Sequence, residues 1–285
     1  MSFWLYQLLA GLSFAMLLFI SSAGLALIFG VMRVLNLAHG AFYAVGAWVA
    51  IALAGWTGSL LLAAMGGIAT AMAIGFAIER ILLSRTPAEE LPQALLTFGI
   101  MLMLGDLALW IWGGTPRTLA RPEWLSGPVR VADIVFPSYR LFVIALGVTI
   151  AGLLWYLQAR TRIGAMIRAA ADDAETARGV GINVPRLSSG VFTVGAGLAA
   201  LGGIGGGPII GGHGGTELGV LLLAFVVVII GGLGSLAGSF VGAIVVGLVD
   251  TLGKALLPDL ALFTLFAPMA LILALRPTGL FGRQQ

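Results

Sequence analysis

A charged segment interrupts an otherwise apolar chain. Eight of the chain's 15 basic and 12 acidic residues lie between Arg160 and Arg186. Carboxylates and guanidinium groups at this density can make ion pairs and charged hydrogen bonds with another protein, whereas they are costly in lipid. We therefore expect residues 160–186 to lie in water and to bind a soluble partner.

A short helix is expected within this segment. The run from Asp172 to Glu175 has the form of a capping box, with an acidic N-cap and a glutamate three residues on, and Gly179 or Gly181 would end the helix. Alanines form one narrow face of this helix and charged residues the other. A helix this short is not stable alone in water, so it needs a docking surface; packing only on its own protein is the alternative. The candidate docking residues are Arg168, Asp172, Asp173, Glu175, Arg178 and Gly181.

The chain lacks the residue patterns of several kinds of catalysis. Lys254, the one lysine, follows Gly253, but Ala255 comes next and Leu248 stands where a P-loop needs its first glycine. No Ser/His/Asp constellation, HExxH sequence or dinucleotide-binding fingerprint stands out. With no cysteine and only two distant histidines, no metal site is expected, and the scattered basic residues argue against nucleic acid as a partner. We therefore expect neither an enzyme nor a bound cofactor.

The composition places the chain in a membrane. Its residues are 60% hydrophobic and 9% charged, with a mean hydropathy of +1.08, whereas about a quarter of the residues in a soluble domain are charged. The first apolar stretch, residues 3–30, exceeds the apolar region of a signal peptide and is expected to stay in the mature chain. We predict an all-α bundle of about eight or nine transmembrane helices in one domain, 1–285. The expected spans lie near 5–30, 38–56, 59–79, 92–113, 139–159, 187–210, 217–232, 236–256 and 259–275.

The distribution of cations predicts the orientation of this multi-pass protein. With the N-terminus outside, ten arginines fall on the cytoplasmic side and five cations outside, which agrees with the positive-inside rule. Segment 160–186 is then cytoplasmic and loop 113–138 is external; a re-entrant early segment would move only the N-terminus. The inner cations are Arg33, Arg80, Arg85, Arg160, Arg162, Arg168, Arg178, Arg186, Arg276 and Arg283, and the outer ones are Arg117, Arg121, Arg130, Arg140 and Lys254.

Glycine is the second compositional signal, with 42 of 285 residues. Two rows at four-residue spacing, 203–215 and 234–242, would let neighbouring helices approach closely. The cluster at 202–215 also contains Pro208 and is rich in helix breakers, so we expect a broken helix or a re-entrant turn there. Irregular backbone at membrane depth must be lined by protein or water, which makes Gly206 and Pro208 candidates for the wall of a pathway.

Several polar residues fall within or beside the spans. Asn36, His39 and Gly40 lie at the junction of the first two spans, where they could shape a gate or bond to broken backbone. Asp106 lies in an apolar run and is expected to be neutral, paired or facing water, with pairing favoured over a pathway role.

Other charged residues receive no functional role. Glu217 and His213 are expected at the solvated outer end of a span. Asp250 and Lys254, four residues apart, could form an ion pair on a helix surface.

Four stretches resemble the permease subunits of bacterial ABC importers for branched-chain amino acids, specifically the shorter of the two permease types. They are GLALIFGVMRVLNLAHGAFYAVGAWVA (24–50), Ile78-Glu79-Arg80, RIGAMIRAAADDAETARGVGINVPRL (162–187), and the closing segments GGLGSLAGSFVGAIVVG (231–247) and RPTGLFGR (276–283). The third stretch resembles the loop by which this family couples to its ATPase. Loop 113–138 carries no such resemblance.

The resemblance implies a permease in the bacterial inner membrane that pairs with a second, homologous permease subunit. It implies two ATP-binding subunits on the cytoplasmic side, which would hold the ATP and Mg²⁺, and a periplasmic substrate-binding protein outside. The short helix would then be a coupling helix. Members of the family divide among branched-chain amino acids, urea, short amides and small carboxylic acids, so an amino acid or similarly small polar solute is expected.

Two other classes of function are compatible with a polytopic chain. A proton-driven secondary carrier would use Asp106 or Glu217 as its titrating group, and a passive channel would conduct without nucleotide. Neither gives the charged segment a docking partner, which is why the importer subunit is the favoured interpretation.

Overall fold

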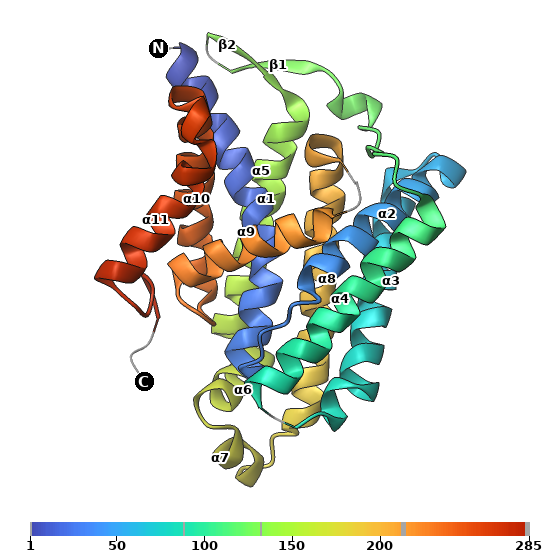
Figure 1. Cartoon of the computed structure of the whole chain (residues 1–285), viewed down its shortest axis with the longest axis vertical. Helices are drawn as coiled ribbons and strands as arrows, with labels where there is room; N and C mark the ends of the chain where they lie inside the picture. The colour runs from blue at the N-terminus through green and yellow to red at the C-terminus, as the bar shows by residue number, and fades with distance from the viewer. Residues whose placement is uncertain (1, 88, 132, 212–214, 283–285) are drawn as a thin grey trace.

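The computed structural model describes residues 2–87, 89–131, 133–211 and 215–282. Within these ranges it is a bundle of helices with one small hairpin (Figure 1). The long helices are α1 (Ser2–Met32), α2 (His39–Thr57), α3 (Leu60–Ile81), α4 (Glu90–Trp112), α5 (Ser138–Arg160), α8 (Val184–Ile210) and α10 (Leu236–Leu256). The shorter elements are η1 (Leu83–Arg85), η2 (Glu123–Leu125), β1 (Pro128–Val131), β2 (Ile134–Pro137), α6 (Arg162–Asp172), α7 (Ala174–Gly179), α9 (Thr216–Gly231), η3 (Pro258–Leu260) and α11 (Ala261–Leu275).

The helical membrane bundle expected from the sequence is confirmed. Among the described residues, seven helices are long and apolar enough to cross a membrane, and they coincide with seven of the expected spans. The other two expected spans, near 217–232 and 259–275, are the apolar helices α9 and α11, of 16 and 15 residues. At 1.5 Å per residue each covers roughly 24 Å, less than the hydrocarbon thickness of about 30 Å. Figure 1 shows α9 lying across the bundle rather than along it, which differs from the expected upright span.

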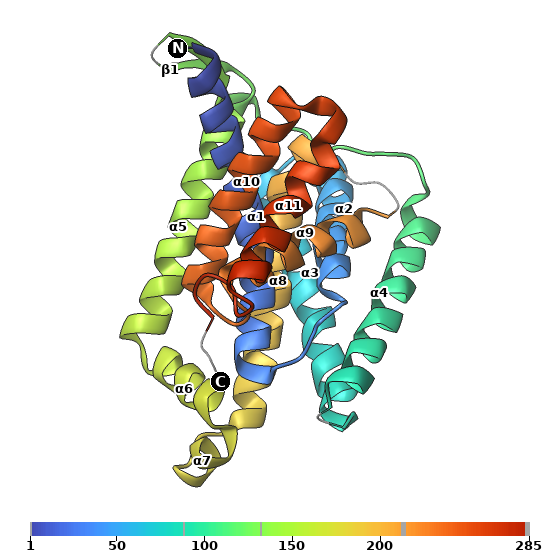
Figure 2. The ribbon, with the colours of Figure 1, turned by 60° about the vertical axis from the view of Figure 1, so that its left-hand side comes forward.

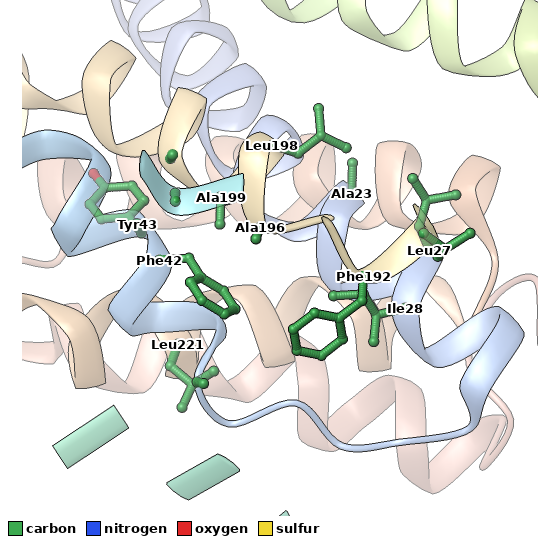
Figure 3. Close-up of a cluster of buried hydrophobic side chains, with 14 of the residues drawn as sticks. Ala23, Leu27, Ile28, Phe42, Tyr43, Phe192, Ala196, Leu198, Ala199 and Leu221 are labelled. Carbon is green, nitrogen blue, oxygen red and sulfur yellow. The ribbon is translucent and has the colours of Figure 1, made fainter. Parts of the chain in front are cut away.

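The core lies where α1, α2 and α8 meet (Figure 3). Phe42 of α2 meets Phe192 of α8 edge to face, with the ring centroids 5.9 Å apart. Burial is uneven across the spans, because 83% of the apolar window of α1 is buried but only 17% of that of α5. The central helices therefore depend on packing within this chain, whereas the outer ones leave much of their surface uncovered by it.

Glycines permit the close approach of the central helices. A Cβ placed on Gly203 of α8 would lie 2.1 Å from the carbonyl oxygen of Tyr43, and one on Gly46 of α2 would lie 2.4 Å from the Cβ of Ala200. Neither position has room for a side chain, which is the role expected of small residues between membrane helices.

The helix that contains the glycine cluster ends only after most of the cluster. α8 continues through Pro208 to Ile210, and the helix ends at Gly211, whose φ is 77°. The next described residue is Gly215, with a φ of 87°, after which α9 begins. The expected break therefore lies later than the glycines at 202–207. Their cost to a helix is offset because the same positions allow α8 to pack directly on α1 and α2.

The two charged loops lie at opposite ends of the bundle. Figures 1 and 2 show the N-terminus and the β1–β2 hairpin at one end and α6 and α7 at the other. The strands pair antiparallel, with Arg130 opposite Val135. Loop 113–138 and segment 160–186 thus face opposite sides, as the sequence predicts.

Candidate functional site

Segment 160–186 folds into two short helices, where the sequence analysis expects one. Thr161 caps α6, because its side chain accepts a hydrogen bond from the backbone N–H of Gly164 at 3.1 Å. α6 then continues through Asp172, so the residue expected to be the N-cap of the coupling helix is instead the last residue of the preceding helix.

Asp173 is the N-cap of α7. Its Oδ1 accepts hydrogen bonds from the backbone N–H groups of Glu175 at 2.9 Å and Thr176 at 3.1 Å, and its Oδ2 accepts one from the Thr176 hydroxyl. The Thr176 side chain and these backbone donors hold the pKa of the Asp173 carboxyl below its ordinary value. The N-cap is therefore displaced by one residue from its expected position, and Thr176 rather than Glu175 lies three residues after it. The expected end of the helix at Gly179 is confirmed.

The two faces of the segment separate as expected. Ala170 and Ala177 are buried, with 4% and 3% exposure, so the alanine face packs on the protein. Two apolar side chains point outward from the same segment, since Val180 is 73% exposed and Ile163 is 57% exposed. A charged surface with exposed apolar groups suits docking to another protein. All six candidate docking residues are exposed: Arg168, Asp172, Asp173, Glu175, Arg178 and Gly181.

The segment is attached to three long helices. α6 packs on α1, α5 and α8, and α7 packs on α6 and α8. The Arg33 guanidinium donates to the carbonyl oxygen of Ala171 at 3.5 Å, and that of Arg168 donates to the carbonyl oxygen of Gln158. Arg33 is the one non-glycine residue with positive φ, 53°, in the described part of the chain. From the sequence Arg33 is expected only as an inner cation, because nothing in the sequence signals a contact over 138 positions.

A buried polar pair joins the start of α8 to the end of α3. The Ser189 hydroxyl donates to the Glu79 carboxylate, and the two residues are 7% and 4% exposed. Glu79 belongs to one of the stretches that carry the family resemblance, but the sequence analysis gave it no role. The pair holds α3 close to where the chain leaves segment 160–186.

Buried polar atoms without partners lie along the start of α2. Asn36 is 0% exposed, and neither its side-chain oxygen nor its side-chain nitrogen has a hydrogen-bond partner among the described residues. The Nε2 of His39 lies 2.6 Å from the carbonyl oxygen of Ser21. In the same described ranges its Nδ1 has no partner, and neither has the Tyr43 hydroxyl one turn further on. Buried polar groups are nearly always hydrogen-bonded. Asn36, His39 and Tyr43, called the polar column below, are therefore costly to bury unless water, a solute or another conformation provides hydrogen-bond partners.

Three of the other pathway candidates, Gly40, Gly206 and Pro208, pack against neighbouring parts of the bundle. Gly40 packs against the backbone of Glu217, and a Cβ on Gly206 would lie 2.2 Å from the Tyr43 hydroxyl oxygen. The carbonyl oxygen of Pro208 accepts a hydrogen bond from Arg121 at 3.3 Å. The structure thus brings Gly206 beside the polar column at 36–43, with Pro208 two residues further along α8.

Asp106 is separate from this column. It is exposed on α4, with exposed Met103 and Leu107 beside it, and no ion pair or hydrogen bond involves it within the described ranges. The favoured expectation of a partner inside the chain is therefore not met, because this face of α4 points away from the bundle.

Glu217 also differs from its expected place. It is half-buried, and a Cβ on Gly105 would lie 2.9 Å from its Oε1, so it sits against the middle of α4 rather than at a solvated outer end. His213 lies outside the described residues. Within the described residues, no group of three or more histidines and carboxylates is placed to hold a metal ion.

Comparison with known proteins assigns the family. A family model described as "Branched-chain amino acid transport system / permease component" matches residues 7–275. The chain is 28% identical to the high-affinity branched-chain amino acid transport system permease protein LivH of Escherichia coli, over 99% of this chain and 97% of the relative. It is 25% identical to BraD of Pseudomonas aeruginosa over the same shares, and 34% identical to the fructose import permease protein FrcC of Rhizobium meliloti over 45% of this chain and 36% of that protein. The chain belongs to the family of branched-chain amino acid transport system permease components.

Proposed function

We propose that this chain, acting as a single permease domain, is the shorter permease of an ABC importer in the bacterial inner membrane. It would form a translocation path with a second, homologous permease, for a branched-chain amino acid or a related small polar solute. Two separate ATP-binding subunits would hold ATP and Mg²⁺ and dock on α6–α7 at the cytoplasmic face. A periplasmic binding protein would deliver the solute to the opposite face, at loop 113–138.

The observation that carries this proposal is the attachment of α6–α7. Its charged side chains and the Val180 side chain are exposed at the surface, where a partner can contact them, while its buried alanines and the Arg33 hydrogen bond tie it to the bundle. A movement imposed on α7 would therefore reach α1 through Arg33 and α8 through the chain itself. From α8 it would reach α3 through Ser189 and Glu79.

The unpartnered polar column suggests where the path opens. Asn36, His39 and Tyr43 have buried polar atoms that lack partners in this conformation. A state in which α1, α2 and α8 separate would give these atoms water or solute as partners. Nucleotide can bias such a state only through contacts that differ between the two conformations, which is the role proposed for α6–α7.

The test is a charge reversal in the coupling helix. Glu175→Arg is expected to leave the complex assembled but to lower solute uptake per ATP hydrolysed about tenfold or more, because like charges replace a favourable contact with the ATPase. Uptake and ATPase activity are measured together in proteoliposomes. The matched control is Glu89→Arg, which makes the same change at another exposed position, between α3 and α4. Normal coupling in Glu175→Arg would remove this residue from the docking surface.

The same assay separates the importer from a proton-driven carrier. A carrier would transport without the ATPase subunits, would stop when an uncoupler is added, and would lose activity in Asp106→Asn. The proposal instead expects no uptake by the chain alone. It also expects the Asp106→Asn complex to take up solute normally, since Asp106 lies away from the polar column. That uptake should be insensitive to uncouplers, because ATP drives it.

A further inference from the structure

The end of the bundle opposite α6 and α7 holds a cavity that has no role so far. It has a volume of about 420 Å³ and lies between α1, α5, α8 and α10. Figure 2 shows α1, α5 and α10 side by side at this end. Under the proposed orientation the cavity faces the periplasm, where a solute would arrive.

The charged groups of the cavity are not balanced. The ion pair expected from the sequence is confirmed, since Lys254 Nζ lies 2.7 Å from Asp250 Oδ2, but only the Lys254 side chain, 57% exposed, is at the helix surface, and the Asp250 side chain is 5% exposed. Arg140 lines the same cavity and makes no ion pair or hydrogen bond within the described ranges. The cavity therefore carries one cation in excess, with the planar donor geometry that suits a carboxylate.

A buried hydroxyl and an apolar wall complete the cavity. Ser13 lines it, is 1% exposed, and has a side-chain oxygen without a hydrogen-bond partner in the part of the chain that the structure describes. Phe14, Leu17 and Ile209 provide apolar surface. A few polar groups set in an apolar lining are typical of a small-molecule site.

The cavity also lies next to the region of the polar column. A smaller cavity of about 150 Å³ shares Tyr6, Arg140 and Ile209 with it and is lined as well by Tyr139. The Tyr139 hydroxyl donates to the carbonyl oxygen of Gly205 at 2.9 Å, and the next residue, Gly206, touches the Tyr43 hydroxyl. Polar groups thus continue from the outer cavity toward the column at 36–43.

We propose that this cavity binds a small carboxylate with an apolar side chain, with Arg140 holding the carboxylate and Ser13 donating a hydrogen bond to it. The Asp250–Lys254 pair would fix the position of the second cation, and an amino group on the solute could share the Asp250 carboxylate. This inference deepens the proposed function, on which it rests, because it selects carboxylate solutes over urea and amides.

The test uses protection of an introduced thiol. The chain contains no cysteine, so Ser13→Cys places a single thiol of this subunit in the cavity. The complex, with its other subunits free of cysteine and without the binding protein, is treated with a small water-soluble maleimide. Four probes are compared: leucine, isocaproate, isoamylamine and urea. Isocaproate resembles leucine without the amino group, and isoamylamine resembles leucine without the carboxylate. Thr251→Cys is a second reporter in the same cavity, and Ser126→Cys, exposed in loop 113–138, is the control.

Leucine and isocaproate are expected to slow labelling at both cavity positions but not at the control. Isoamylamine and urea are expected to have no effect. Arg140→Gln should raise the half-protecting concentration about tenfold or more, and Arg140→Lys should raise it less because it keeps the charge.

Three results would overturn the inference. They are equal protection by isoamylamine, protection that is unchanged in Arg140→Gln, and blockage by phosphatidylglycerol with no effect of the solutes, which would make the cavity a lipid site. Labelling needs no ATP, so a failure here leaves the coupling test with Glu175→Arg unaffected. A failure of that test likewise leaves the labelling result standing.

Discussion

The contact of α8 with α1 and α2 and the α6–α7 segment are stabilised in opposite ways. In the first, glycines bring backbones so close that side chains are excluded, and the surrounding residues are almost all buried. In the second, most side chains are exposed, and the local structure depends on the caps Thr161 and Asp173 and on a long-range hydrogen bond from Arg33. Contacts within the chain fix the geometry of the core, whereas α6–α7 keeps an exposed surface that this chain does not cover.

This difference shows how a membrane subunit can transmit movement. A closely packed group of helices is bistable rather than continuously deformable, so it shifts as a unit when one of its helices is displaced. A segment with few packing contacts can adapt to a partner and then move that helix. The pair of Ser189 and Glu79, which is the junction between α8 and α3, would then pass the movement on to α3.

The largest effect is expected when the closest contact of the core is filled. Gly203→Leu would drive a side chain into the Tyr43 carbonyl, because even a Cβ would lie 2.1 Å from that oxygen. Overpacking typically costs about 1 to 3 kcal/mol and occasionally more, and here the obstacle is backbone, which cannot move aside as a side chain can. The variant should fail to give a monodisperse complex after extraction, as measured by size-exclusion chromatography and a thermal shift assay.

The matched control for this substitution lies on the same helix. A Cβ on Gly190 has nothing within 4 Å, so Gly190→Leu should leave assembly and thermal stability close to the parent. If the two variants behaved alike, the close packing of α8 on α2 would not be what stabilises the core.

A smaller effect is expected at the junction. Ser189→Ala removes the donor to the buried Glu79 carboxylate, which should cost about 1 to 3 kcal/mol and lower the melting temperature. Ser188→Ala changes the neighbouring residue, which makes no hydrogen bond in the described structure, and should have little effect. Because the pair joins α3 to α8, Ser189→Ala should also lower uptake per ATP, measured in proteoliposomes. A lower melting temperature with normal coupling would make the pair a stabilising contact only.

Periodicity and composition predicted the helical architecture because both follow from the lipid environment. Long apolar runs must become helices there, so the spans are readable in sequence. The direction of α9 could not be predicted in this way. A largely apolar run of 16 residues has the same composition whether it crosses the membrane or lies across the bundle, and its packing against Gly40 and Gly105 decides the direction.

The site was predictable only where its signals are local. The polarity of residues 160–186 and the end of the helix at Gly179 are local properties of the sequence, but the choice between Asp172 and Asp173 as N-cap depended on how far α6 extends. Contacts between distant positions left no signal. Arg33 with Ala171, Ser189 with Glu79, and Arg140 beside the Asp250–Lys254 pair become visible only in the fold.

The smallest effect on stability is expected at the N-cap of α7, because the cap makes only a few local hydrogen bonds. Asp173→Ala removes the acceptor for the backbone N–H groups of Glu175 and Thr176, so amide hydrogen exchange at residues 174–179 should become about fivefold faster. Asp173→Asn keeps an acceptor and should behave like the parent. Since the folded pKa of Asp173 lies below its unfolded value, the contribution of the cap is fully present above about pH 4 and is lost only as the pH falls through the folded pKa. The difference in protection between the parent and Asp173→Ala should therefore be constant between about pH 5 and 8. A difference that changed within that range would show that another titrating group, and not this carboxylate, determines the stability of α7.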